Sequence, residues 1–333
     1  MPSFDEQVRQ KVFEDFEEDK AKTLVHNYEH AQQKLQYDVY PYIRGAEPDL
    51  SDHGVTHIAN VKENATLLLG EHGIVTSLSG IEMYCLGMFI LFHDAANVLG
   101  REDHHKHVAE IFDKIRPGSA TRHEKSLVVR ATHAHTGTAH DGSADTLKEV
   151  GEFDHLEGQR VRLRQLAAVL RLADELAEGP QRTSEFMQSK KLISPGSQIF
   201  HQYASSTHVF IDRGAGRIVL SYEIEVPTQG AKKTRLRNLS KFLEFVYGRI
   251  LKANQERQYA RHYSELVSPF KATEVTFNFH CGSQLLETDL PGLKLTDLVV
   301  PGDPKKLIHE IDPQYDIACL AKDVLAKCVG EDV

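Results

Sequence analysis

The chain has 333 residues, of which 41% are hydrophobic and 26% are charged. It is long enough for one large domain or two smaller ones with an apolar core, which excludes a disordered tail protein. No apolar run approaches the roughly 18 to 20 residues of a membrane-spanning helix, and the acidic start of the chain differs from a secretory signal, so we expect a soluble protein without a membrane partner. The net charge of −9 argues against a protein that coats nucleic acid without specificity.

The cysteines indicate no metal site or disulfide, whereas the histidines are numerous enough to suggest a functional site. The four cysteines are widely spaced and form no C-x-x-C motif: Cys85, Cys281, Cys319 and Cys328. We therefore expect neither a zinc ribbon nor a disulfide framework, and we expect a cytoplasmic location. Histidine is abundant, with 19 residues against 4 methionines and no tryptophan. The positions of these histidines decide the functional interpretation.

Apolar residues at helical intervals dominate the first 180 residues. Residues 4–40 predict one or two amphipathic helices. Another helix is expected to begin near Ser51, where Asp49-Leu50-Ser51-Asp52 offers capping groups. The nearly continuous apolar run 81–92 predicts a buried helix that leads directly into His93-Asp94. Further helices are expected over 108–115, 127–132 and 158–178. This part of the chain is therefore predicted to be all-helical.

The pattern changes after Pro180. Residues 207–212 and 217–226 alternate around a Gly-rich turn, which predicts a β-hairpin. Residues 232–261 predict a basic helix, with a solvated cationic face as the main interpretation and a groove for a polyanion as the alternative. A strand at 274–280 and a closing amphipathic helix at 315–328 are also expected. The predicted fold class is mainly α, with a smaller α+β C-terminal part that contains the hairpin.

Two potential metal ligands stand at the end of the buried run. Burying His93 and Asp94 is costly unless something pairs with them, and a divalent metal would do so; simple capping of the helix is the alternative. His57, on the helix that begins near Ser51, and Asp174, an acid in an apolar helix face, add two more ligands. This nitrogen and oxygen set suits Mn, Fe, Co, Ni, Zn or Mg, and the ligand types alone do not choose among them.

The order of His57, then His93-Asp94, then Asp174 on successive helices resembles the HD-domain superfamily of metal-dependent phosphohydrolases. The resemblance covers roughly residues 50–185. It rests on the H-x-x-x-V sequence at His57, the apolar run before His93-Asp94 and the L-R-L-A-D-E-L sequence at Asp174. It implies an HD-type helical bundle and hydrolysis at phosphorus, with a nucleotide or nucleic-acid phosphoester as the substrate.

Some branches of this superfamily hold two metal ions by means of extra histidines between the His-Asp pair and the last Asp. The resemblance implies that His104 is one such ligand and that His133 and His135 are others, although these two depart from the adjacent pair that is usual there. One or two divalent ions are therefore expected. The dipeptides His140-Asp141 and Asp154-His155 lie in polar turn sequences and are not expected to bind metal.

The expected mechanism is metal activation of a water for attack at phosphorus. Asp94 is expected to bridge two ions or, with a single ion, to orient the water. Lys62, Arg130 and Arg171 are candidates for binding the substrate phosphate. Arg171 is the best placed of them, because it precedes Asp174 by close to one helical turn.

Two alternatives to a phosphodiesterase or nucleotidase stay open. One is a non-catalytic HD-fold module that binds a phosphorylated signal or a nucleotide, and the other is a deoxynucleotide triphosphohydrolase. The expected parts are an N-terminal helical segment (1–48), an HD-type metal-binding domain (49–185) and an α+β region (186–333). Assembly into a homo-oligomer is a further option.

Overall fold

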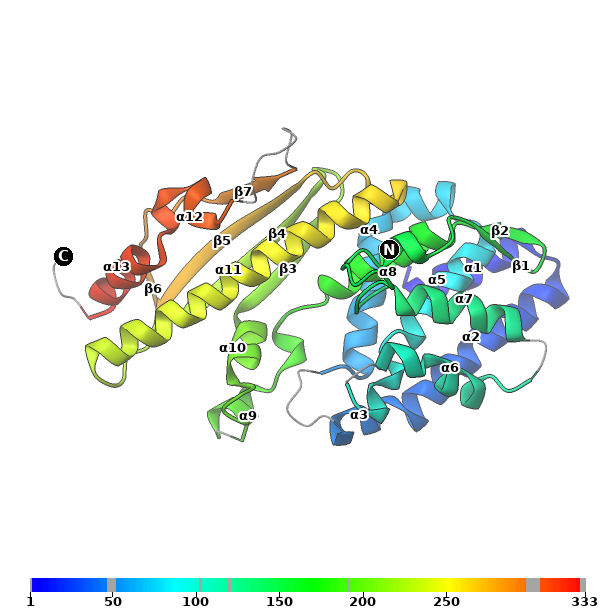
Figure 1. The fold of residues 1–333 in the computed structure, drawn as a ribbon, viewed down its shortest axis with the longest axis horizontal. Helices are drawn as coiled ribbons and strands as arrows, with labels where there is room; N and C mark the ends of the chain where they lie inside the picture. Colours follow the sequence, from blue (N-terminus) through cyan, green and yellow to red (C-terminus); the bar gives the residue numbers. More distant parts are fainter. Residues whose placement is uncertain are drawn as a thin grey trace. The chain divides into compact units, whose positions relative to one another are not determined.

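The computed structural model describes residues 2–46, 52–101, 104–118, 121–190, 192–297 and 306–329. The chain forms two compact units (Figure 1): one holds Met1–Ala177 and Tyr259–Pro269, and the other holds Glu178–Gln258 and Phe270–Val333. The fold class is confirmed, because helices dominate the chain and a small sheet follows in its C-terminal half. The three-part division expected from the sequence stays a prediction.

The first unit is built mainly from helices. They are α1 (Phe4–Asp15), α2 (Glu18–Asp38), α3 (Tyr40–Ala46), α4 (Val55–Ser77), α5 (Gly80–Phe92), α6 (His104–Ile115), α7 (Arg122–His133) and α8 (Leu163–Glu175). The core helix is α5, in which every residue is buried, as the apolar run predicts. Ser79 and Glu82 form a capping box at its start, which satisfies backbone N–H groups that have no partner within the helix. The 3-10 helix η1 (Ala95–Leu99) follows directly after His93-Asp94.

Helix α4 begins at Val55. Ser51, near which the sequence predicts this start, lies outside the described residues, and Asp52 and His53 are not helical. Gly70 interrupts the helix with a φ of 66°, a left-handed conformation that glycine adopts without a side-chain clash. His57 therefore lies in the first turn of α4, well before this break.

The expectation that the first 180 residues are all-helical is wrong. Strands β1 (Asp154–Leu156) and β2 (Gln159–Val161) form an antiparallel hairpin. Its turn residues, Glu157 and Gly158, both have positive φ, the backbone that matches the right-handed twist of paired strands. Three-residue strands are too short for an alternating pattern to stand out in the sequence.

The second unit contains a sheet in the order β3-β4-β5-β6, with β7 paired to β5. The strands are β3 (Thr207–Asp212), β4 (Arg217–Glu225), β5 (Ala272–Cys281), β6 (Gln284–Leu286) and β7 (Leu293–Thr296). The predicted β3–β4 hairpin is confirmed. Strands β4 and β5 are parallel, and such a pair needs a long crossover. Helix α11 (Lys232–Tyr263) lies between them in the chain and supplies it. The remaining helices are α9 (Glu185–Ser189), α10 (Gln198–Ser206), α12 (Ile308–Ile311) and α13 (Ile317–Val329).

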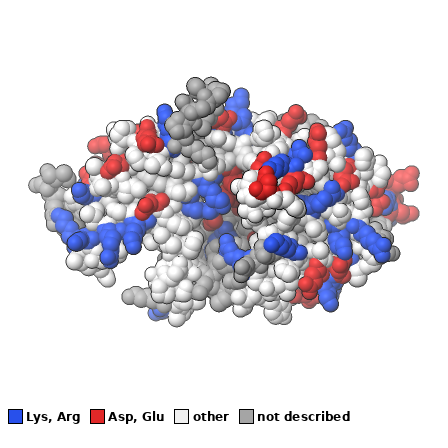
Figure 2. Space-filling view, viewed as in Figure 1, with Lys and Arg blue, Asp and Glu red and all other residues white. Residues whose placement is uncertain are grey.

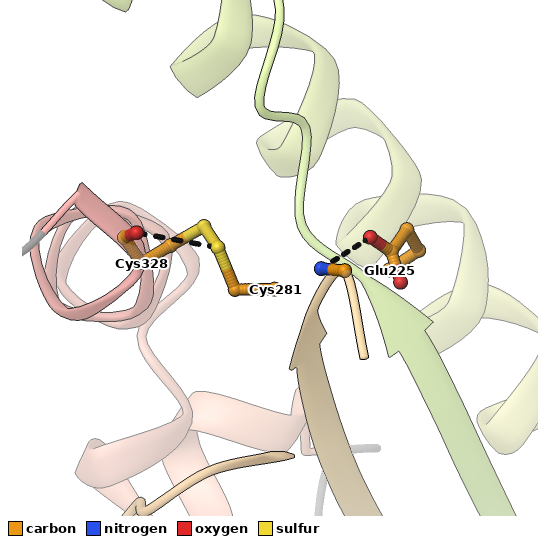
Figure 3. Close-up of a disulfide and its surroundings, with 4 residues drawn as sticks. Glu225, Cys281 and Cys328 are labelled. Atoms are coloured by element: carbon orange, nitrogen blue, oxygen red, sulfur yellow. Dashed lines mark hydrogen bonds between the residues drawn. A yellow bond between two sulfur atoms is a disulfide. The ribbon is translucent and has the colours of Figure 1, made fainter. Parts of the chain in front are cut away.

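A disulfide joins Cys281, at the end of β5, to Cys328 in α13 (Figure 3). Beside it, the backbone N–H of Gly282 donates a 2.9 Å hydrogen bond to Glu225 at the end of β4. The expectation of unpaired cysteines is therefore wrong for these two, and it holds for Cys85 and Cys319. The pairing depends on how α13 packs beside β5, which cysteine spacing does not reveal. The disulfide removes the cysteine-based reason to expect a cytoplasmic location.

Within the described residues, no single helix is long and apolar enough to cross a bilayer. One strongly bent pair of segments, Gly80–Leu99 and His104–Ile115, reaches the required length and composition only when its two parts are taken together.

Candidate metal centre

Four side chains identified from the sequence converge in the first unit. His57 comes from α4, His93 and Asp94 follow the end of α5, and Asp174 lies in the last turn of α8. One donor atom of each lies within 4.8 Å of the others. His57 and His93 have no exposed surface. The Asp174 side chain is 25% exposed, so this group, which we call the first group, meets solvent on the side of α8.

The spacing of the donor atoms is that of ligands around an ion. The His57 Nε2 atom lies 3.1 Å from Asp174 Oδ1 and 3.3 Å from His93 Nε2. Asp94 Oδ2 lies 3.4 Å from each of these two imidazole nitrogens. Ligands about 2.1 Å from a common ion are separated by roughly 3.0 to 3.4 Å in octahedral or tetrahedral geometry. The donor set therefore fits a divalent cation.

A second group shares the Asp94 carboxylate. Its other members are His104, at the start of α6, and His135, just after α7. Asp94 Oδ1 lies 3.3 Å from His104 Nε2 and 3.6 Å from His135 Nε2. Because Asp94 turns Oδ2 toward the first group and Oδ1 toward the second, a single carboxylate faces both. Its side chain makes no capping hydrogen bond to the following helix, η1.

Backbone carbonyls orient three of the histidines. The Nδ1 atom of His93 lies 2.9 Å from the carbonyl oxygen of Ile90, and that of His104 lies 3.0 Å from the carbonyl oxygen of Arg101. His135 Nδ1 makes the same kind of contact with Thr132. A carbonyl oxygen only accepts hydrogen bonds, so each Nδ1 carries a proton, and Nε2 is the ring nitrogen that faces the neighbouring donor atoms. Histidines that bind a metal typically donate their other ring N–H to a carbonyl or carboxylate oxygen in this way.

The charges of the first group favour a bound cation. Burial alone would raise the pKa of Asp94 and of Asp174, but the neighbouring histidines outweigh it and hold both pKa values well below the ordinary value. Burial alone would lower the pKa of His93, and the two carboxylates outweigh it and hold this pKa well above the ordinary value. Two ionised carboxylates in a buried site need positive charge beside them, which the protonated His93 supplies here and a bound cation would supply in its place.

The structure separates His135 from His133. His133 joins neither group of donor atoms; its ring lies 4.7 Å from the ring of the buried His105. Gly137 passes so close to His105 that a Cβ atom there would lie 3.3 Å from the ring. The assignment of His57, His93, Asp94, Asp174, His104 and His135 as metal ligands stays a prediction. The placement of His133 argues against a direct role for its imidazole.

Two of the cations expected to bind phosphate have other partners. Lys62 is buried, with its Nζ 2.6 Å from Asp5 Oδ1 and 5.3 Å from the centre of the Tyr28 ring. It thereby ties α4 to α1 and α2. Arg130 forms an ion pair with Asp154 at the start of β1. These placements argue against direct contact of either side chain with a substrate phosphate.

Arg171 supports the segment that carries His135. Its Nη1 atom donates hydrogen bonds to the carbonyl oxygen of Ala134 at 3.2 Å and to the Thr146 hydroxyl at 2.9 Å. The guanidinium lies over the ring of Tyr259, 4.8 Å from its centre. This geometry makes Arg171 a positioning residue for the second group.

The sequence did not indicate three further residues that hold the segment after His135 in place, namely Asp145, Tyr259 and Tyr263. The Tyr259 hydroxyl donates to Asp145 Oδ1 at 2.8 Å and accepts from the backbone N–H of Leu147 at 2.8 Å. The Tyr263 hydroxyl donates to the same carboxylate. No local signal marks these contacts, because more than 110 residues of chain separate the partners.

Comparison with known proteins adds one finding to this geometry. No curated protein and no solved structure shows a significant match to the chain. The model of the HD-CE family matches residues 47–252, a span that includes both groups of donor atoms and more than half of the chain. The chain therefore belongs to the HD-CE family.

Proposed function

We propose that this protein is a metal-dependent phosphohydrolase that cleaves a phosphoester bond of a nucleotide or a nucleic acid. The observation that carries the proposal is the sharing of the buried Asp94 between two groups of histidine and aspartate donors. The resemblance of the motifs at His57, His93-Asp94 and Asp174 to the HD-domain superfamily, together with membership of the HD-CE family, supports the same activity.

The first group would hold one divalent ion, and His104, His135 and Asp94 would hold a second. Bound divalent ions would supply an acidified water as the nucleophile and positive charge beside the phosphoryl oxygens. Mn, Fe, Co, Ni, Zn and Mg all accept mixed nitrogen and oxygen ligands. The donor atoms are therefore compatible with each of these six metals and do not select one of them.

The protein's own residues would fix the reacting geometry. The carbonyl oxygens of Ile90, Arg101 and Thr132 hold the imidazole rings of the ligands in one orientation. Burial of the first group excludes bulk water, which strengthens electrostatic interactions within the site. The partial exposure of Asp174 leaves one side open for a substrate to approach.

The test is hydrolysis by the purified full-length protein with Mn²⁺ or Ni²⁺. The substrates would be bis(p-nitrophenyl) phosphate, a panel of nucleotides and single-stranded oligonucleotides. We expect product release that is lost in His93→Ala and retained in His107→Ala, a matched change at an exposed histidine of α6. Product analysis identifies the reaction, since tripolyphosphate marks a triphosphohydrolase and a nucleoside monophosphate marks a phosphodiesterase. A wild-type protein that binds metal but cleaves no substrate would support the non-catalytic binding module instead.

A further inference from the structure

The first half of α11 carries a ridge of cations in the second unit. Lys233, Arg237 and Lys241 follow one another at intervals of four residues, so they lie along one face of the helix, and all three are exposed. Among the residues that the structure describes, no acidic side chain forms an ion pair with any of them. Figure 2 shows Lys and Arg side chains gathered over this part of α11.

Helix stability does not explain the cations in the first turn of α11. The N-terminal end of a helix carries a partial positive charge, so cations in this region are unfavourable and acids are favourable. The first turn of α11 contains Lys232, Lys233 and Arg235 and no acid. The chain as a whole has a net charge of −9, but this end of α11 is locally positive. A positively charged surface of this kind attracts an anionic partner.

An aromatic pair extends the same ridge. Phe245 lies four residues after Lys241, and its ring is 5.4 Å from that of Phe200, which comes from α10. The two rings meet edge to face, and Phe200 is 52% exposed. From Lys233 to Phe245 the ridge is about 18 Å long at 1.5 Å per residue. A polyanion without bases could bind to the row of cations alone. The exposed aromatic side chain beside the row therefore favours a ligand that also carries bases.

We propose that this surface, made of Lys233, Arg237, Lys241 and the Phe200–Phe245 pair, binds single-stranded nucleic acid. The cations would contact successive phosphates, and Phe200 would stack on an unpaired base, which are the two contacts that such complexes combine. A duplex keeps its bases stacked on one another, and an acidic protein segment has no bases, so neither would use Phe200. The inference rests on residues of the second unit and does not depend on the proposed hydrolase activity.

The experiment measures fluorescence anisotropy of labelled dT20 and U20 with the full-length protein at several salt concentrations. The first variant is Lys233→Gln/Arg237→Gln/Lys241→Gln. Its control, Lys22→Gln/Lys34→Gln/Lys294→Gln, removes the same charge from three exposed lysines elsewhere. We expect the first variant to bind at least tenfold more weakly, with a slope of log K against log salt that is shallower by about 2, since each lost phosphate contact contributes roughly 0.7.

The second variant, Phe200→Ala, tests stacking separately from charge. We expect it to weaken binding by roughly 5- to 150-fold, the range of one lost base stack, with an unchanged salt slope. Circular dichroism checks that the variants fold. The proposal is overturned if the wild type does not bind dT20 or U20, or if the ridge variant binds as well as its control. It is also overturned if Phe200→Ala has no effect and a duplex or polyglutamate binds equally well, since the surface would then recognise polyanions in general.

Discussion

Two His-Asp dipeptides in the first unit have the same composition and opposite environments. His93-Asp94 directly follows α5 and is buried, with donor atoms from α4, α6, α8 and the segment after α7 around it. His140-Asp141 lies in a turn, where the His140 side chain is 89% exposed and pairs with Glu149, and Asp141 pairs with Lys148. The prediction of a polar turn is confirmed for His140-Asp141 and is wrong for Asp154-His155, which lies in strand β1. The two dipeptides have the same residue types. What distinguishes the candidate metal centre is that its side chains are buried and that other donor atoms lie close to them.

The charges of the two dipeptides differ for the same reason. The histidines around the buried Asp94 overcome the penalty of burial and hold the pKa of its carboxyl well below the ordinary value. Lys148 and Ser143 also lower the pKa of Asp141, but water surrounds that carboxylate, and exposed ion pairs add little to stability. Loss of charge at Asp94 should therefore have large consequences, and loss of charge at Asp141 should have almost none.

The largest effect is expected for Asp94→Ala, which removes the carboxylate that the two groups share. Bound metal should fall close to zero, and hydrolysis should fall by at least about 100-fold, because loss of a group that only hydrogen-bonds to a metal ligand already costs roughly 10- to 100-fold. Inductively coupled plasma mass spectrometry and a phosphodiester assay measure the two quantities. The matched variant Asp141→Ala should keep both at the wild-type level. If both variants lost metal and activity to the same extent, the prediction that only the buried dipeptide binds metal would be wrong.

Metal removal should destabilise the first unit. An ion present at 100 times its dissociation constant stabilises the folded state by about 2.7 kcal/mol, which corresponds to a shift of roughly 5 °C or more in Tm for a unit of this size. EDTA should therefore lower the Tm of the wild type and of Asp141→Ala. It should leave the Tm of Asp94→Ala unchanged. A Tm that EDTA does not change in the wild type would contradict a bound ion.

A smaller loss is expected for His104→Ala, which affects the second group and leaves the first complete. Metal content should drop from about two ions per chain to about one, and hydrolysis should fall by roughly 10- to 100-fold. The control is His107→Ala, on an exposed position of the same helix. An unchanged metal content in His104→Ala would show that the second group does not hold an ion.

The smallest effect is expected for Tyr259→Phe, which removes one hydroxyl from the support of the His135 segment. A lost hydrogen bond to a charged group costs about 1.5 to 3 kcal/mol, and only part of this should reach His135. Metal titration should show an affinity for the second ion that is reduced by about tenfold or less and an unchanged affinity for the first. The control is Tyr37→Phe, at a residue that is 65% exposed. Equal weakening of both ions would contradict a local positioning role.

Local sequence patterns were sufficient for several features. The apolar run before His93 predicts a buried helix, and α5 is buried at every residue. The alternating pattern around the Gly-rich turn predicts the β3–β4 hairpin, which the structure confirms. Such features depend on interactions between residues close in the chain, so composition and spacing are enough to reveal them.

The sequence by itself determined the helical character of the first unit and the positions of four residues suited to a metal, because periodicity fixes which face of a helix is apolar and exposes polar residues that interrupt it. Only the tertiary structure decided that His135 joins Asp94 while His133 packs on His105, that Arg171 supports a loop, and that Cys281 pairs with Cys328. Each of these outcomes depends on which distant segments pack together, and packing between distant segments leaves no periodic signal in a single sequence.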